Sequence, residues 1–105
     1  MAQTVTMGIE AQRTLAHGSF DTTYVAVGTA LPDYTRALIL YNGTDAVVQF
    51  SLDNGTTDFL PLPVGEVLYL DLFQLGIHTL ASSHRVAVKD IGTPSSGSVY
   101  VGVVL

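Results

Sequence analysis

The chain has 105 residues, a length that predicts a single domain, residues 1–105, with one modest hydrophobic core. The absence of cysteine excludes disulfides and thiolate metal sites, and no stretch of about 18 apolar residues is present to span a membrane. Four Lys and Arg residues against nine Asp and Glu give a net charge of −5, and the four cations are scattered, so neither nucleic acid nor an anionic membrane is an expected partner.

Short runs of β-branched and aromatic residues alternate with Gly, Pro, Asn and Asp, which is the pattern of an all-β domain. Residues 1–12 are polar and weakly patterned, so they form either an extended N-terminal arm or an ordinary edge strand or frayed terminus. The chain also allows a further short strand at residues 57–60. The main expected strands are residues 3–7, 12–18, 22–28, 35–42, 45–52, 65–72, 84–91 and 97–104.

The stretch around Asn42–Gly43 predicts a β-hairpin. The runs TRALILY and AVVQFSL flank NGTD, and Asn-Gly supplies the positive φ angles of a tight hairpin turn. Along the second run Val48, Phe50 and Leu52 share one face, so Phe50 is an expected core residue. Both faces of the first run are apolar, which predicts a central and well-covered strand.

The second half of the chain contains a further turn, a proline-rich connection and three strands. DNGTT reverses the chain, and Pro61 and Pro63 predict an extended connection because proline cannot donate to a strand ladder. In GEVLYLDL, Val67, Tyr69 and Asp71 face away from the intervening leucines. FQLGIHTLASS, residues 73–83, predicts a helical turn or a loop, and GTPSSG joins the last two strands.

Eight short strands in a chain of this length predict a two-sheet β-sandwich, and a jelly roll uses that number of strands. An immunoglobulin-like sandwich is the main alternative. Such a domain is expected to carry a buried Trp and, in antibody domains, a Cys pair, and this chain contains neither residue type. The jelly roll is therefore the favoured architecture.

No catalytic, cofactor-binding or metal-binding residue is expected in this chain. His17, His78 and His84 are the only histidines, and their spacing matches no metal-ligand motif. The segment SSHR carries some residue types of a catalytic triad, but the sequence has no G-x-S-x-G nucleophile elbow. DNGTTD lacks the spacing of a calcium-binding loop and is better explained as a turn. We therefore expect a protein that is not an enzyme.

The amino-acid composition suggests that part of the protein surface is covered by a partner. Charged residues make up 12% of the sequence, hydrophobic residues 48%, and the mean hydropathy is +0.41. A small monomer normally keeps its surface charged for solubility, so oligomerisation or embedding in an assembly is expected. The alternative is a surface of uncharged Thr, Ser and Gly. The five tyrosines are spread over five elements, which favours core and sheet-edge packing over a stacking platform for sugars.

The run SLDNGTTDFLPLPVGEVLYLDLFQLGIHTLA, followed by VAVKDIGTPSSGSVYVGVVL, resembles small virion structural proteins of tailed bacteriophages. In such proteins an S-x-D-N-G-T hairpin precedes a connection containing proline and glycine and a strand of the L-x-L-D-L type. A closing hairpin with the pattern V-K-x-x-G-T-P-S-S-G-S-V-Y-V is the other recurring element. The resemblance covers residues 36–105 and includes no catalytic motif.

The resemblance implies a capsid cement (decoration) protein, made in the bacterial host cytoplasm, that sits on the outer capsid surface of the virion. It would bridge subunits of the major capsid protein as a homodimer or homotrimer. The same resemblance allows a tail, adaptor or fibre-base protein, and a small carbohydrate-binding module is a further alternative. The candidate contacts are the N-terminal arm and two hairpin tips expected to be exposed: Gln3, Thr4, Val5, Thr6, Asn42, Thr44, Asp45, Asn54, Thr56, Thr57 and Asp58.

Overall fold

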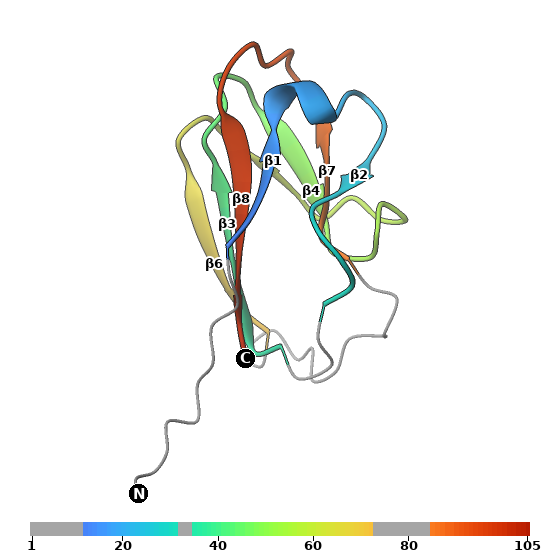
Figure 1. Ribbon diagram of the computed structural model, residues 1–105, viewed down its shortest axis with the longest axis vertical. Helices are drawn as coiled ribbons and strands as arrows, with labels where there is room; N and C mark the ends of the chain where they lie inside the picture. Colours follow the sequence, from blue (N-terminus) through green and yellow to red (C-terminus); the bar gives the residue numbers. More distant parts are fainter. Residues whose placement is uncertain (1–11, 32–34, 73–84) are drawn as a thin grey trace, which may run out of the picture.

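The computed structural model describes residues 12–31, 35–72 and 85–105. Within these ranges the chain forms eight β-strands in two layers, together with a short 3-10 helix, η1 (His17–Ser19) (Figure 1). The strands are β1 (Arg13–Ala16), β2 (Val25–Ala26), β3 (Ala37–Asn42), β4 (Val48–Ser51), β5 (Leu60–Leu62), β6 (Val67–Asp71), β7 (Ala87–Asp90) and β8 (Ser98–Val104).

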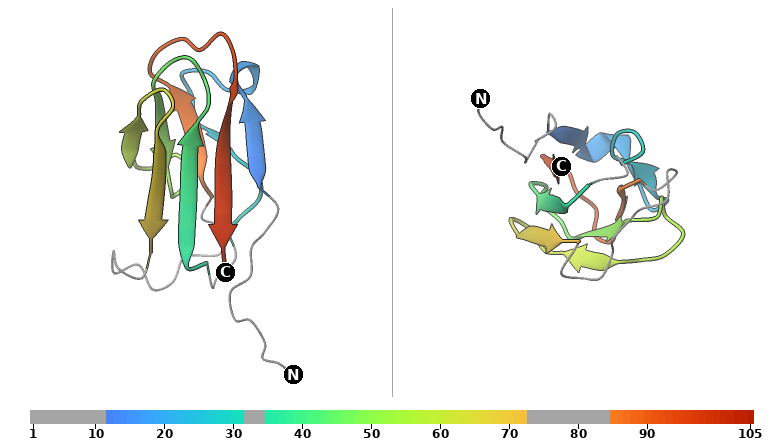
Figure 2. Two further views of the ribbon diagram at one scale, coloured as in Figure 1. Left: turned by 90° about the vertical axis from the view of Figure 1, so that its left-hand side faces the viewer. Right: turned by 90° about the horizontal axis from the view of Figure 1, so that it is seen from below.

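The strands form two four-stranded antiparallel sheets that face each other. Sheet A has the order β1-β8-β3-β6, and sheet B has the order β2-β7-β4-β5. Strand β1 pairs with β8, β2 with β7, β3 with β6 and β4 with β5, so the chain is folded as one long hairpin about residues 52–59. Pairing of β3 with β8 then joins the two strand pairs of sheet A, and pairing of β4 with β7 joins the two strand pairs of sheet B (Figure 2). The expected all-β, two-sheet sandwich is confirmed.

The hydrophobic core lies between the two sheets and uses the inward-facing positions of both. Because side chains alternate across a strand, every second residue of the long strands points into it. Burial of each such side chain contributes roughly 1.5–3 kcal/mol. Its fully buried members include Val27, Leu38, Leu40, Val48, Phe50, Val88, Val99, Val101 and Val103. The predicted core position of Phe50 is confirmed.

The predicted hairpin around Asn42–Gly43 is wrong, because β3 lies in sheet A and β4 lies in sheet B. Residues 43–47 cross between the sheets, and neither Asn42 nor Gly43 has a positive φ angle. The Asn54–Gly55 pair does adopt positive φ angles, 60° and 92°, and it turns the chain between the paired strands β4 and β5. The segment containing GTPSSG also crosses between sheets, from β7 to β8, so the closing hairpin is likewise wrong.

The proline-rich connection contains one of the eight strands. Strand β5 spans Leu60–Leu62, and its central Pro61 lies opposite Gln49 of β4. The missing N–H of proline is tolerated there because β5 is at the edge of sheet B. The short strand allowed at residues 57–60 is therefore displaced towards Leu62. The predicted strand at 3–7, residues 1–11 of the predicted arm and the predicted loop at 73–83 lie outside the described residues.

Candidate interaction surface

The outer side of sheet A carries a continuous group of uncharged residues from three adjacent strands, β8, β3 and β6. We call this group the tyrosine face, and its members are Ile39, Tyr41, Val67, Tyr69, Tyr100 and Gly102. Strand register places Tyr100, Tyr41 and Val67 side by side in one row. Gly102, Ile39 and Tyr69 form the next row. The left view of Figure 2 looks onto this side of sheet A.

Exposure of the tyrosine face increases towards β6, the edge strand. Val67 is 60% exposed and Tyr69 is 57% exposed, whereas Ile39, Tyr41 and Tyr100 are half-buried. The difference arises because β6 pairs with β3 on one side only, whereas β3 lies between two strands. The predicted central position of β3 is confirmed. Its outer side, however, remains partly open to solvent at Ile39 and Tyr41.

The rings of Tyr41 and Tyr100 stack on each other at one end of the face. Their centroids are 5.5 Å apart and their planes differ by 26°, which is an offset stack between directly opposed residues of β3 and β8. Both rings also lie over the backbone of Gly43, where an added Cβ would come within 2.9 Å of Tyr100 Cε2 and 3.0 Å of Tyr41 Cε2. The stack therefore fixes these two rings and covers one face of each against a sugar.

The tyrosine face carries almost no charge. Of the outward positions on β3, β6 and β8, only Asp71, at one corner of the sheet, has a side chain that is charged at neutral pH. A surface with this composition has little to desolvate when it becomes covered, whereas a buried unpaired charge is costly. Its chemistry suits a neutral protein surface and offers no cation to a polyanion.

Three of the five tyrosines lie on one face of sheet A, although each belongs to a different strand. Tyr41, Tyr69 and Tyr100 are far apart in sequence but occupy neighbouring strands with their side chains on the same side. The signal within each strand was the alternation of GEVLYLDL and of SVYVGVV, which puts the tyrosines opposite the buried Leu or Val residues. Only the order of the strands in sheet A shows that the three strands carrying these tyrosines are neighbours.

Two of the predicted contact residues, Asn42 and Thr44, are buried, so their expected exposure is wrong. The Asn42 amide Nδ2 donates hydrogen bonds to the carbonyls of Ala46 and Leu62, both at 2.8 Å. Its Oδ1 accepts from the amide of Thr44 at 2.9 Å and from Thr44 Oγ1 at 2.6 Å. This side chain ties β3, the crossing segment 43–47 and β5 together, which explains why it faces inward.

Asp45 is exposed at the tip of the crossing segment, as predicted, but it is engaged by the segment that precedes β8. Its Oδ2 accepts from Ser95 Oγ at 2.6 Å, and its Oδ1 accepts from the amide of Ser95 at 2.7 Å. These hydrogen bonds, the side-chain bond first, lower the pKa of Asp45 from 3.8 to about 2. The hydrogen bonds of Asp45 therefore connect residues 43–47 to the segment between β7 and β8.

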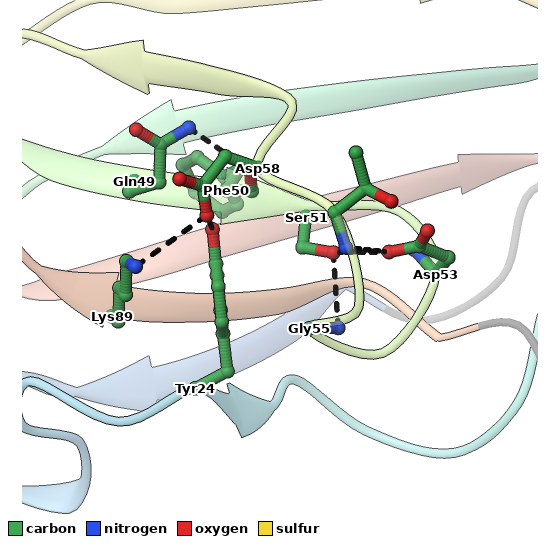
Figure 3. A network of polar contacts seen from close by, with 9 residues as sticks. Tyr24, Gln49, Phe50, Ser51, Asp53, Gly55, Asp58 and Lys89 are labelled. Atoms are coloured by element: carbon green, nitrogen blue, oxygen red, sulfur yellow. Dashed lines mark hydrogen bonds and ion pairs between the residues drawn. The ribbon is translucent and has the colours of Figure 1, made fainter.

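The second predicted tip, residues 54–58, is exposed at Asn54, Thr56, Thr57 and Asp58, and it is held by a polar network (Figure 3). Ser51 Oγ donates to Asp53 Oδ1 at 2.7 Å and accepts from the amide of Gly55 at 3.0 Å. Asp53 Oδ1 also accepts from the amide of Thr57 at 2.9 Å. The bond from Ser51 is the main reason that the pKa of Asp53 falls from 3.8 to about 2.

The same tip is anchored to β7 and to the residue that precedes β2. Tyr24 Oη donates to Asp58 Oδ1 at 2.6 Å, and Lys89 Nζ lies 3.4 Å from that oxygen and 4.7 Å from the Tyr24 ring centroid. Burial, and then the hydrogen bond to Asp58, raise the pKa of Tyr24 above its ordinary value. The hydrogen bond from Tyr24 lowers the pKa of Asp58. A preformed loop of this kind presents a fixed shape to any partner.

The two predicted tips do not form one surface, because they lie at opposite ends of β4. Residues 43–47 precede this strand and residues 52–59 follow it. Neither tip contributes to the tyrosine face. Gln3, Thr4, Val5 and Thr6 lie outside the described residues.

The acidic side chains at the two tips predict a loss of stability in acid. Asp45 and Asp53 have folded-state pKa values of about 2, below the ordinary value of 3.8. The ionised forms of these two side chains therefore stabilise the fold at pH values above the ordinary pKa. This stabilisation is lost as the pH falls towards the folded-state pKa. We expect the double variant Asp45→Asn, Asp53→Asn to lose less stability than the wild type between these pH values, measured by urea unfolding. Parallel pH profiles would contradict the assignment.

The described residues offer no evident metal-binding chemistry. No group of three or more His, Cys, Asp or Glu side chains among them is placed to hold a metal ion. His17 Nδ1 lies 3.2 Å from the carbonyl oxygen of Gly97, and His78 and His84 lie outside the described residues. No helix within the described ranges is long and apolar enough to cross a membrane.

The functional interpretation of the chain rests on its fold and on the tyrosine face. Both are defined by strand register and burial. Comparison of the chain with protein-family models, with curated proteins and with solved structures found no match.

Proposed function

We propose that this protein is a non-enzymatic virion protein of a tailed bacteriophage, a capsid cement protein that binds the outer shell and bridges subunits of the major capsid protein. The observation that carries the proposal is the tyrosine face, an uncharged and partly exposed sheet surface on a chain with only 12% charged residues. The sequence resemblance over residues 36–105 supplies the virion context. Synthesis would take place in the host cytoplasm.

We also propose that the sandwich is a jelly roll. Eight strands in two sheets, with the chain folded as one long hairpin, fit that architecture. Supporting this assignment, β1 lies beside β8 and β2 beside β7, so strands from the two ends of the chain alternate between the sheets. The rigid sandwich would hold the tyrosine face in a fixed orientation for docking.

The proposed action of the protein is thermodynamic. A protein that binds only the assembled shell stabilises that shell by mass action. Many copies, each bound weakly through an uncharged face, would together resist the outward pressure of packaged DNA. This role requires no catalytic residue and no cofactor.

The first test is the copy number of this chain in purified virions, measured by quantitative mass spectrometry against the major capsid protein. We expect a number comparable to that of the coat subunits, because positions on an icosahedral shell are that numerous. A number limited to one ring would favour the tail, adaptor or fibre-base alternative. Complete absence from the particle would contradict a virion role.

The second test addresses the tyrosine face itself. Ile39→Lys places a charge at the centre of the face, and we expect it to weaken binding to isolated capsids at least about tenfold, or about 1.4 kcal/mol. Ile91→Lys is the control for an added lysine elsewhere on the surface, because Ile91 is 56% exposed and lies beyond β7, away from this face. Thermal unfolding of both variants checks whether each of them is folded. Equal capsid binding by the two variants would remove the face from the proposal.

A carbohydrate-binding module is the second candidate, because three tyrosines share the face. Stacking between Tyr41 and Tyr100 counts against it, since a sugar ring needs an open aromatic face. Tyr69 is the one member of the three that is more than half exposed. A glycan array decides between the two functions: binding that Tyr69→Ala abolishes would favour the module, and no binding would favour the virion role.

A further inference from the structure

The four sheet edges of the sandwich are not equivalent. Edge strands expose backbone donors and acceptors to other chains, and natural proteins block them with short strands, proline or inward-pointing charges. In sheet B, β2 has two residues and β5 carries Pro61 at its centre. At the β1 edge of sheet A, Arg13 sits at an inward-facing position and its Nη1 donates to the carbonyl of Thr29 at 2.7 Å.

Strand β6, the fourth edge, carries none of these blocking features. Its five residues, VLYLD, include no proline, glycine or cation, and no other strand of the described chain pairs with its outer side. Its outward side chains Val67 and Tyr69 are more than half exposed. An edge strand that lacks these blocking features and carries apolar or aromatic outward side chains at its centre is a template for pairing with another chain.

The hydrogen-bond register identifies which backbone groups point to this open side. The amide of Leu72 donates to the carbonyl of Arg36 at 3.0 Å. The backbone N–H and C=O groups of residue 72 and of the even-numbered residues of β6 therefore point towards β3. In an antiparallel pair the alternate residues are directed the other way. The N–H and C=O groups of Val67 and Tyr69 therefore point to the outer side of β6.

We propose that β6 is the subunit interface of a homodimer, in which the β6 strands of two copies pair antiparallel about a twofold axis at Tyr69. The two sheets A would then form one continuous eight-stranded sheet. This inference goes beyond the virion role and concerns the chain alone in solution. It selects the homodimer from the two oligomers that the sequence resemblance implies.

A second copy fits this edge because β6 complements itself in this register. Tyr69 faces Tyr69 of the second copy, and an aromatic cross-strand pair is favourable. Val67 faces Asp71 of the second copy, so no two like charges are directly opposed. The row Gly102, Ile39, Tyr69 continues without interruption into the same row of the second copy. The tyrosine face is thereby doubled in area on one side of the dimer.

Two charge substitutions with opposite expected outcomes test this register by sedimentation. Tyr69→Lys brings two introduced ammonium groups together at the twofold axis, and we expect the dimer dissociation constant to rise at least about tenfold. Val67→Lys places the ammonium group opposite Asp71 of the second copy, and we expect the dimer to persist. The two positions are matched in exposure, at 57% and 60%. A monomeric wild type, or equal weakening by both substitutions, would overturn the proposal.

Cysteine cross-linking gives a second measurement that needs no change in charge. The chain contains no cysteine, so each introduced thiol is unique. Across a hydrogen-bonded antiparallel pair the Cα atoms are about 5.5 Å apart, which suits a disulfide, so Tyr69→Cys should form a covalent dimer under mild oxidation. Val67→Cys should not, because four residues of strand, about 13 Å, would separate the two thiols.

Both measurements use the purified chain without virions, so their failure is distinguishable from failure of the virion role. Cross-linking of Tyr69→Cys alone would support the stated register. Cross-linking of Val67→Cys, or no cross-linking of either variant, would overturn it. Ile39→Lys, which weakens capsid binding under the proposed function, is expected to leave the dimer intact because Ile39 lies on β3, one strand away from the axis.

Discussion

Replacing Phe50 by alanine is expected to lower the free energy of unfolding by about 3–5 kcal/mol. Phe50 is fully buried at the centre of sheet B, opposite Leu60 of β5 and Val88 of β7. Truncation removes a large apolar side chain and leaves a cavity that fixed strands on both sides cannot close. A loss of this size is a large part of the 5–15 kcal/mol that stabilises a typical domain.

Phe59→Ala is the matched control for this substitution. Phe59 is 40% exposed and follows the turn that leads to β5, so the same truncation there should cost less than about 1 kcal/mol. Chemical denaturation of both variants at one pH gives the comparison. Similar losses of unfolding free energy for the two variants would mean that the cavity between the sheets does not determine the destabilisation.

Replacing Asn42 by aspartate is expected to destabilise the fold by about 3–5 kcal/mol at neutral pH. The side chain of Asn42 is fully buried, and its Nδ2 donates to two carbonyls, those of Ala46 and Leu62. Aspartate would place a charged acceptor against both of these oxygens. It would also leave the Leu62 carbonyl without its Nδ2 donor, and buried unsatisfied groups are costly.

This destabilisation should depend on pH in a defined direction. Burial against two carbonyls raises the folded-state pKa of the introduced carboxyl group above its unfolded value. A raised pKa means that the folded protein tolerates the protonated form better than the charged form. The variant should therefore lose further stability relative to the wild type as the pH rises above about 4.

Asn54→Asp is the matched control for this second prediction, because Asn54 also precedes a glycine. Asn54 is exposed and has a positive φ angle of 60°, a conformation that aspartate tolerates nearly as well as asparagine. We expect a change within about 0.5 kcal/mol. Urea unfolding of both variants from pH 4 to pH 8 separates the two Asn-Gly sites, and equal losses would contradict the distinct roles assigned to them.

If the dimer forms as proposed, the assembly has a simple functional consequence. One side of the dimer presents two tyrosine faces related by a twofold axis. The dimer could then contact two neighbouring coat subunits with equivalent surfaces, which is what bridging requires. The preformed tips at residues 43–47 and 52–59 lie at opposite ends of β4 and remain outside the β6 interface.

The amino-acid sequence by itself determined the class of fold and much of its core. Alternation with a period of two, punctuated by turn residues, was sufficient to predict β-strands and to place Phe50 inside. Strand formation and the inward position of Phe50 depend on residues that are close together in the sequence. The same reasoning located the strand GEVLYLDL and placed Val67 and Tyr69 on the face opposite its leucines.

Only the tertiary structure decided how the strands are paired, and with it the candidate site. The Asn-Gly signal at residues 42–43 is local, and a local turn signal does not specify whether the next strand continues the same sheet or crosses to the other. Strand pairing between β3 and β8 joins residues about sixty positions apart, and that pairing brings Tyr41 beside Tyr100. The long-range register likewise buries Asn42 and leaves β6 at an edge, because these outcomes depend on contacts that no single stretch of sequence contains.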